Sequence, residues 1–174
     1  LNLGHALFFG VGAYATALLN IHFGLPPWAT IPIGAIAAVL AGFILCLPAL
    51  RLRGFYFALV SLALPIILSG IVLAFHDFTG GDDGLMGITY LAGDHVTRYY
   101  IVVLTMIASL FIMWKLTDSQ SRLVRTGVIL HAIREDEISA RASGINTTQY
   151  KFIAFAISGF FAGIAGGLYA HYMR

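Results

Sequence analysis

Charged side chains are scarce in this chain of 174 residues. Asp, Glu, Lys and Arg make up 10% of the sequence, whereas they make up about 25% of a typical soluble domain. The first of them is Arg51, so the whole N-terminal stretch before it carries none. Together with 59% apolar residues and a mean hydropathy of +0.88, this scarcity excludes a soluble globular domain.

Cysteine is almost absent as well, since Cys46 is the only one. One thiol excludes a disulfide framework and a metal site built from several cysteines, and its apolar neighbours favour a small buried side chain. The sequence also lacks the basic start of a cleavable signal peptide and begins at Leu1 rather than Met. We therefore expect residues 1–174 to be a single transmembrane domain from a longer protein.

Long uncharged runs are what the chain has instead. A membrane-spanning helix needs about 20 apolar residues, within a range of about 17–25. The fold class that these runs predict is an all-α, polytopic transmembrane helical bundle. The five predicted spanning segments lie at about residues 5–23, 28–48, 55–75, 99–116 and 150–172.

The distribution of Lys and Arg predicts the orientation of these segments. Eight of them lie in the connection at 51–53 and in the stretch 115–151, which includes a long predicted loop at 117–149. The other long loop, at 76–98, has only Arg98 together with four aspartates. We therefore expect the 117–149 loop to be cytoplasmic, in a multi-pass membrane protein. Because the positive charges lie on one side of a membrane, the net charge of +2 does not indicate a nucleic-acid partner.

Two of the predicted segments are rich in glycine. Gly159, Gly163 and Gly167 recur every four residues in the last segment, which places them on one helical face and predicts close packing against another helix. The first segment contains Gly10 and Gly12 and has few strong helix formers near its start. Such a backbone fits either a broken helix that lines a pathway or a tightly packed helix, and the sequence leaves both open.

The stretch from His131 to Gly144 differs from the rest because it is polar and helix-prone. Five charged side chains occupy the eight positions from Arg134 to Arg141. Asp136 and Glu137 lie near the start of the predicted helix, where acidic side chains suit the helix dipole. Glu137 lies four residues before Arg141, which favours a helical ion pair, and Gly144 can end such a helix in the left-handed conformation. Burying these charges in lipid would cost about 2.5–3.5 kcal/mol for each Arg or Asp. We therefore expect a short cytoplasmic helix, which either docks on a partner or is an ordinary solvated loop helix.

Other function classes find little support in the residues. The sequence has no G-x-x-x-x-G-K-[ST] phosphate loop and no HExxH metal motif, and Ser158 lacks the pattern of a G-x-S-x-G elbow. We therefore predict no enzyme, with no catalytic, cofactor-binding or metal site. The alternative is a secondary transporter or channel for a small polar solute, which would place ionisable residues inside its spans. The candidates for that role are His5, His22 and His171.

Four motifs stand in order along the chain. They are LNLGHALFFGVGAY at 1–14, LRLRGFYFALVSLAL at 50–64, TGGDDGL at 79–85, and AIREDEISARASGIN at 132–146 followed by KFIAFAISGFFAGIAGGLYA at 151–170. The first three resemble SLGHAAFFGIGAY, LRLRGPYFAIVTLAF and TGG-x-x-GL in the permease subunits of branched-chain amino-acid ABC importers. The last resembles the cytoplasmic loop and following helix of those subunits. The chain is similar to the LivM/LivH type, and closer to LivM.

The sequence departs from this family pattern at three positions. Asn2 stands for a usual Ser, Phe55 stands for a Pro, and Val128 follows Gly127 where a Gly-Arg pair is usual. The change at Phe55 can alter the start of the third segment. The change at Val128 removes a positive charge near the polar helix, which puts the contacts of that region in doubt.

The resemblance implies a subunit of an ATP-driven importer for branched-chain or other amino acids, located in the bacterial inner (plasma) membrane. Such a permease forms the translocation path in the membrane lipid with a second permease subunit, and a periplasmic or lipid-anchored solute-binding protein delivers substrate. Cytoplasmic ABC ATPase subunits hydrolyse the ATP. By this resemblance residues 133–144 are the coupling helix, and the residues expected to contact the ATPase are Ile133, Arg134, Glu135, Asp136, Glu137, Ala140, Arg141 and Gly144.

The resemblance also implies candidates at the path and at the outer mouth. The candidates for the translocation path are Asn2, Gly4, His5 and Tyr14. The residues expected to form a tight loop at the outer mouth, where a solute-binding protein would dock, are Thr79, Gly80 and Gly81.

Overall fold

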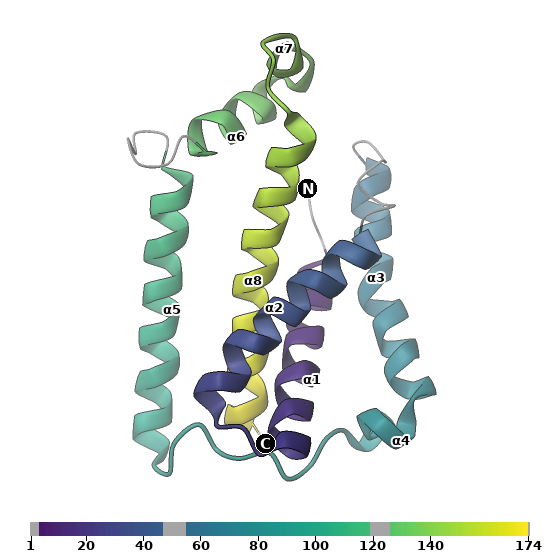
Figure 1. The fold of residues 1–174 in the computed structure, drawn as a ribbon, viewed down its shortest axis with the longest axis vertical. Coiled ribbons are helices and arrows are strands. Elements are labelled where there is room, and N and C mark those ends of the chain that lie inside the picture. Colours follow the sequence, from purple (N-terminus) through teal and green to yellow (C-terminus); the bar gives the residue numbers. More distant parts are fainter. Residues whose placement is uncertain (1–3, 47–54, 119–125, 174) are drawn as a thin grey trace. The chain divides into compact units, whose positions relative to one another are not determined.

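The computed structural model describes residues 4–46, 55–118 and 126–173, and within these ranges it contains helices and no strand. The predicted all-α class is therefore confirmed. In chain order the elements of Figure 1 are α1 (His5–Phe23), α2 (Pro27–Cys46), α3 (Phe55–Ala74), α4 (His76–Thr79), the 3-10 helix η2 (Gly81–Asp83), α5 (His95–Thr117), α6 (Thr126–Glu135), α7 (Glu137–Ala142) and α8 (Thr147–Met173).

The five predicted hydrophobic segments correspond to α1, α2, α3, α5 and α8. Helices α1, α2, α5 and α8 are each long and apolar enough to cross a membrane. Helix α3 bends by 95° into the segment at 76–83, and this pair makes a fifth candidate if it counts as one broken span. The predicted loop at 76–98 contains two short helices, α4 and η2, and α5 begins inside it at His95.

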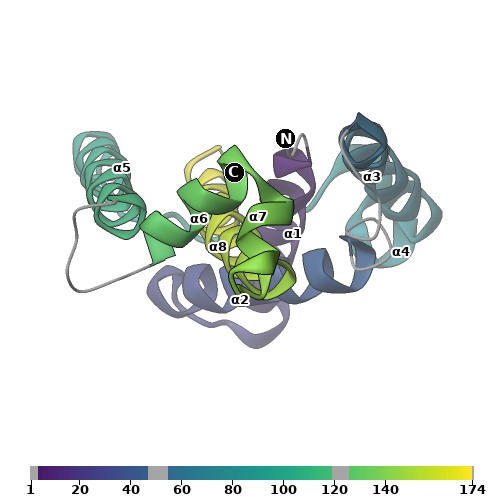
Figure 2. The same ribbon diagram turned by 90° about the horizontal axis from the view of Figure 1, so that it is seen from above.

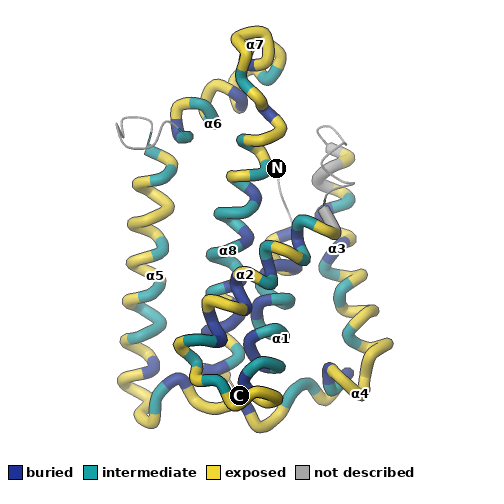
Figure 3. Tube along the Cα trace, in the orientation of Figure 1, coloured by how far each residue is buried: buried dark blue, intermediate teal, exposed yellow. Residues whose placement is uncertain are grey.

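The chain divides into two compact units, which are described separately. The first contains Leu1–Arg98 and Ser158–Arg174, and the second contains Tyr99–Ile157. In the first unit, α2 crosses beside α1 and the C-terminal half of α8 in both views (Figures 1 and 2). The buried side chains of this unit gather where α1 and α2 meet (Figure 3), and Leu7, Ala35 and Ala38 are fully covered.

Helix α1 is unbroken from His5 to Phe23, so the packed helix is the alternative that the structure supports. Its glycines allow the backbones to come close. A Cβ atom added at Gly12 would lie 2.5 Å from the carbonyl oxygen of Gly163 in α8, and one at Gly34 in α2 would meet the hydroxyl of Thr16. Side-chain atoms have no room at these contacts, which is how glycine stabilises helix pairs in lipid.

Glycine and proline also set the turn between α1 and α2. Gly24 has φ 63°, and its N–H donates to the carbonyl oxygen of Asn20 at 3.0 Å, which ends α1. Left-handed backbone of this kind favours glycine. Pro27 is the first residue of α2, where its fixed φ suits the helix and its missing N–H has no helical partner to lose.

In the second unit, α5 carries its apolar side chains outward on every side. None of the residues in its most apolar window is buried, and Leu104, Leu110 and Trp114 are all exposed. Helices that are apolar all round are typical of membrane spans. After α5, a Cβ atom at Gly127 would lie 2.6 Å from the carbonyl oxygen of Thr117, so the start of α6 lies against the end of α5.

Candidate functional site

The short helix that the sequence predicts from near Asp136 and Glu137 to Gly144 is confirmed as α7, whereas the range 133–144 that the resemblance implies also takes in the end of α6. Helix α6 ends at Glu135, and α7 begins at Glu137. Asp136 between them is extended, with φ −151° and ψ 109°, and its carboxylate accepts the N–H of Ile138 at 2.8 Å and the hydroxyl of Ser139 at 2.6 Å. Asp is a preferred N-cap residue. The Ser139 hydroxyl, followed by the N–H groups of Ile138 and Ser139, lowers the pKa of Asp136.

The end of α7 is set by a glycine turn, as predicted for Gly144. This residue has φ 82°, its N–H donates to the carbonyl oxygen of Arg141 at 2.9 Å, and the N–H of Ile145 donates to that of Ala140 at 3.1 Å. These two bonds form a Schellman motif. The side chain of Asn146 then accepts the N–H of Gln149 at 3.1 Å. Only four residues therefore separate the end of α7 from the start of α8.

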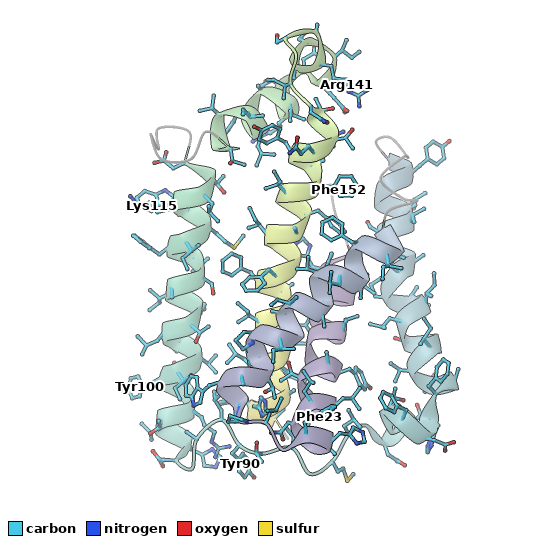
Figure 4. The ribbon with its side chains drawn as sticks, viewed as in Figure 1. Phe23, Tyr90, Tyr100, Lys115, Arg141 and Phe152 are labelled. Carbon is cyan, nitrogen blue, oxygen red and sulfur yellow. The ribbon has the colours of Figure 1, made fainter. Side chains whose placement is uncertain are left out.

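Charged and polar side chains connect α7 to the first turn of α8. The Oε1 atom of Glu137 lies 2.8 Å from Nη2 of Arg141, and its Oε2 lies 2.6 Å from Nζ of Lys151. The Nε of Arg141 also donates to the hydroxyl of Thr147 at 2.8 Å. We call these four residues the Glu137 cluster, and Figure 4 shows Arg141 beside the turn between the two helices.

The cluster favours the ionised form of its carboxylate. The hydrogen bond from Lys151 lowers the pKa of Glu137, the charges of Lys151 and Arg141 act in the same direction, and partial burial opposes them. The side chains of Glu137, Arg141 and Lys151 remain 35%, 52% and 44% exposed, so solvent screens their attraction. The Glu137–Arg141 spacing was visible in the sequence, whereas the contributions of Thr147 and Lys151 depend on the turn and were missed.

The remaining residues of the predicted coupling set do not share one surface. Ile133 and Ala140 are buried, whereas Arg134 and Glu135 are exposed. The most exposed apolar side chain of α7 is Ile138, at 80%, and it is not among the residues predicted from the sequence. Single exposed apolar side chains are common on protein surfaces, so Ile138 by itself does not identify a contact surface.

The predicted path residues are only partly brought together. Asn2 lies outside the described residues. Gly4 is buried and precedes α1, and His5 is exposed, with its Nε2 atom 2.6 Å from the hydroxyl oxygen of Ser158 in α8. Tyr14 is half-buried two and a half turns further along α1, roughly 13 Å from His5 at a rise of about 1.5 Å per residue. The sequence did not indicate Ser158 as the partner of His5.

A second polar group lies at the other end of α1 and α8. His171 is fully buried, with Nε2 3.0 Å from the hydroxyl of Thr30 in α2 and Nδ1 2.7 Å from the carbonyl oxygen of Thr89. The side chain of Asn20 accepts the N–H of Thr89 at 2.8 Å and donates to the carbonyl oxygen of Leu25 at 2.7 Å. These bonds hold the connection around Thr89 against the ends of three helices. His171 was considered only as a candidate ion relay in the sequence.

The predicted outer-loop residues form a tight turn after α3. The hydroxyl of buried Thr79 lies 2.6 Å from the carbonyl oxygen of Val72 and accepts the N–H of Gly81 at 3.2 Å. Gly80 and Gly81 both have positive φ, at 77° and 54°. A Cβ atom at Gly80 would collide with the backbone of Gly84. The spacing of glycines in TGGDDGL is therefore what the fold of this turn requires.

Apolar helices of spanning length, joined by polar turns, define this chain as a multi-pass integral membrane protein. It belongs to the family described as branched-chain amino acid transport system / permease component, which matches residues 1–174. This is a family of transport permeases and not of enzymes, and its members and the apolar helices indicate the bacterial inner membrane.

Named relatives agree with this assignment. The chain is 35% identical, over 97% of its length, to the high-affinity branched-chain amino acid transport system permease proteins LivM of Salmonella typhimurium and of Escherichia coli. It is 25% identical, over 91% of its length, to a probable branched-chain amino acid transport permease protein LivH of Methanocaldococcus jannaschii. The chain spans 45% and 53% of the LivM and LivH relatives, about half their length. No solved structure matches it.

Proposed function

We propose that this chain is part of a membrane-spanning permease subunit of an ATP-driven importer for branched-chain or other amino acids. The names of the LivM and LivH relatives support the substrate class. In this proposal the complete protein pairs with a second permease subunit, receives substrate from a solute-binding protein, and contacts cytoplasmic ABC ATPase subunits, where ATP is hydrolysed. The whole of 1–174 serves as one membrane domain of that subunit.

The observation that carries this proposal is the junction between α7 and α8. A short, polar and solvent-exposed helix is joined through a four-residue turn to a long apolar helix, and the side chains of the Glu137 cluster connect the two helices. We propose that the segment from Ile133 to Gly144 faces the cytoplasm and docks on an ATPase, with Ile138 as its apolar contact. Lys and Arg in the flanking stretch support the cytoplasmic side.

We further propose that His5 and Ser158 line the translocation path. Ser158 lies seven residues after Lys151, or about 10 Å at a rise of about 1.5 Å per residue, which is about a third of the way into a hydrocarbon core of about 30 Å that begins after this charged residue. A polar pair at that depth is disfavoured against lipid and is expected to face protein or a water-filled cavity. Gly4, Tyr14 and, from the sequence alone, Asn2 belong to the same proposal.

The turn at Thr79, Gly80 and Gly81 is proposed as the docking point of the solute-binding protein. It follows α3 on the side opposite to the α6–α7 segment in the orientation that the Lys and Arg counts predict. The exposed carboxylates of Asp82 and Asp83 beside it would offer polar contacts to such a partner.

The function is tested with the full-length subunit, its partner permease, the ATPases and the solute-binding protein in proteoliposomes. Uptake from a panel of radiolabelled amino acids, with leucine first, is expected to require internal ATP and the binding protein and to persist when the proton gradient is collapsed. Uptake that follows the proton gradient without ATP would instead identify a secondary transporter.

The orientation has its own test in whole cells. The exposed Ser143 in the α7–α8 turn is changed to Cys, and Asp83→Cys in the opposite turn is the matched control. A membrane-impermeant maleimide is expected to label Asp83→Cys in intact cells and Ser143→Cys only after lysis. Labelling of Ser143→Cys from outside would refute the cytoplasmic assignment of α7.

A further inference from the structure

The turn between α7 and α8 fixes the end of α7 but leaves its direction to the side chains. Both backbone bonds of the Schellman motif, from Gly144 and Ile145, return to carbonyl oxygens of α7 itself. They close α7 without binding the backbone of α8. The backbone alone therefore lets α7 swing about the residues that precede Thr147.

The Glu137 cluster supplies two attachment points on α8. Thr147 accepts a hydrogen bond from Nε of Arg141, and Lys151 contacts Oε2 of Glu137. Thr147 and Lys151 are four residues apart, so they lie one above the other on the same face of α8. Two side chains from one turn of α7 therefore bind two points along one face of α8. Two such contacts fix the direction of α7 relative to α8, whereas a single contact would let α7 rotate about it.

Within the Glu137 cluster, Lys151 provides the ion pair that connects α7 to α8. Glu137 offers two carboxylate oxygens, and each binds a different cation, Arg141 in α7 and Lys151 in α8. The Arg141 pair lies within α7 and stays in place whatever direction that helix takes. The Lys151 pair crosses between the helices, so it is the ion pair that is lost when α7 swings.

We propose that Lys151 and Thr147 are positioning residues, which hold α7 in one direction relative to α8 so that a displacement of α7 by an ATPase reaches the membrane span. This inference rests on the proposed function and adds to it the two residues of α8 that transmit the movement. Neither residue touches substrate or nucleotide in this proposal. Substitution of either residue is expected to lower the uptake achieved for each ATP hydrolysed, while the ATPase remains bound.

The test uses the full-length subunit assembled with its partners in proteoliposomes. Lys151→Gln and Thr147→Val are compared with Lys151→Arg, which keeps the cation, and with Lys115→Gln, which removes an exposed lysine near the end of α5. Hydrogen exchange of the amides in 137–151 reports the attachment itself. Leucine uptake and ATP hydrolysis, measured together, report coupling.

Lys151→Gln is expected to raise amide exchange in 137–151 and to reduce leucine uptake per ATP hydrolysed by up to about fivefold, the largest effect expected from the loss of one exposed ion pair. Thr147→Val is expected to act in the same direction. Lys151→Arg and Lys115→Gln are expected to behave as the unmodified protein, and all variants are expected to retain bound ATPase.

Two results would overturn the inference. Unchanged exchange in Lys151→Gln would show that the ion pair does not hold α7, and raised exchange with unchanged uptake per ATP would show that the attachment plays no part in coupling. Loss of coupling in Lys151→Arg equal to that in Lys151→Gln would also refute the role of the cation. An unmodified complex that takes up no amino acid with ATP would refute the proposed function instead, and the exchange measurement would still test the attachment.

Discussion

Helix α8 is held by two opposite kinds of contact in its two halves. In its C-terminal half the glycines of α8 lie against backbone atoms, as where a Cβ atom at Gly163 would be 2.8 Å from Cα of Ala35. Near its start the contacts are ion pairs between charged side chains that stay 35–52% exposed, together with a hydrogen bond to the buried hydroxyl of Thr147. The first kind leaves no freedom of movement, whereas the second can be adjusted by solvent, salt and binding partners.

The difference in energy between these contacts is large. Helices in lipid gain stability from close van der Waals contact, and inserting extra methyl groups into such a contact costs about 1–3 kcal/mol or more. An exposed ion pair contributes only about 0–1 kcal/mol. The glycine contacts therefore set the stability of the first unit, while the Glu137 cluster sets the direction of a helix at little energetic cost.

The largest expected effect comes from filling the glycine contact. Gly163→Val places side-chain atoms where Ala35 and Ala38 already lie, within 3 Å of the new Cβ. We expect a loss of about 3 kcal/mol, which corresponds to a melting temperature lower by roughly 6–12 °C for a chain of this size. The measurement is thermal unfolding of the full-length protein in detergent, followed by intrinsic fluorescence.

Gly70→Val in α3 is the matched control, because nothing lies within 4 Å of a Cβ atom at Gly70. It is expected to unfold within about 2 °C of the unmodified protein, since substitutions without a steric cost usually change stability by less than about 0.5 kcal/mol. Equal melting temperatures for the Gly163 and Gly70 variants would contradict the close contact.

The next effect in size concerns the turn rather than the helix pair. Gly144 has φ 82°, and a side chain in left-handed backbone costs about 1–2 kcal/mol, more for a β-branched residue. We expect Gly144→Val to insert normally but to lose most ATP-driven uptake, whereas Gly144→Asn, which tolerates this backbone, keeps most of it. Normal uptake by Gly144→Val with the ATPase still bound would rule out α7 as the coupling helix.

A smaller effect is expected inside α7. Arg141→Glu replaces the ion pair to Glu137 with a like-charge pair at the same four-residue spacing, a change of about 0.4–1 kcal/mol, and removes the bond to Thr147. We expect uptake to fall by a few fold with little change in melting temperature. Arg141→Lys, which keeps the charge, serves as the control, and a drop in uptake of equal size in both variants would speak against the electrostatic explanation.

The smallest effect is the response of the Glu137 cluster to pH. The pKa of Glu137 is lowered chiefly by Lys151, so the ionised carboxylate is favoured in the folded state. The ionised carboxylate of Glu137 contributes fully to stability above the ordinary glutamate pKa of about 4.3. This contribution is lost as the pH falls through the lowered pKa. Protection factors for 137–151 are therefore expected to stay constant from pH 7 to about pH 5. In Lys151→Gln the loss of protection is expected to begin at a higher pH, and identical profiles would contradict the stated cause.

The positions of the long helices could be predicted from sequence because run length and composition decide them. Helix α1 lies at His5–Phe23, where the uncharged run predicted a segment at 5–23. The short helices at 76–83 could not be predicted in the same way. They depend on the hydroxyl of Thr79 returning to Val72 and on Gly80 lying against Gly84, which are contacts across several residues with no periodic pattern.

The polar site was predictable only where its contacts are local. The Glu137–Arg141 pair follows from helical spacing, and the left-handed Gly144 follows from the preference of glycine for that backbone. The start of α7 near Asp136 and Glu137 was predicted from the acidic side chains there, whereas the separate helix α6 just before it was not. The contact of His5 with Ser158 joins residues 153 apart in the chain, and no local pattern indicates such a pair.

The contact of Gly12 with Gly163 can form only late in the synthesis of the chain. The two residues are 151 positions apart, so at roughly 5–20 residues per second the ribosome needs about 8–30 s to deliver the second after the first. During that interval the face of α1 that contains Gly12 has no partner, because α8 has not yet been synthesised. Nascent α1 must therefore be sheltered by α2, by lipid or by an insertion factor before α8 arrives.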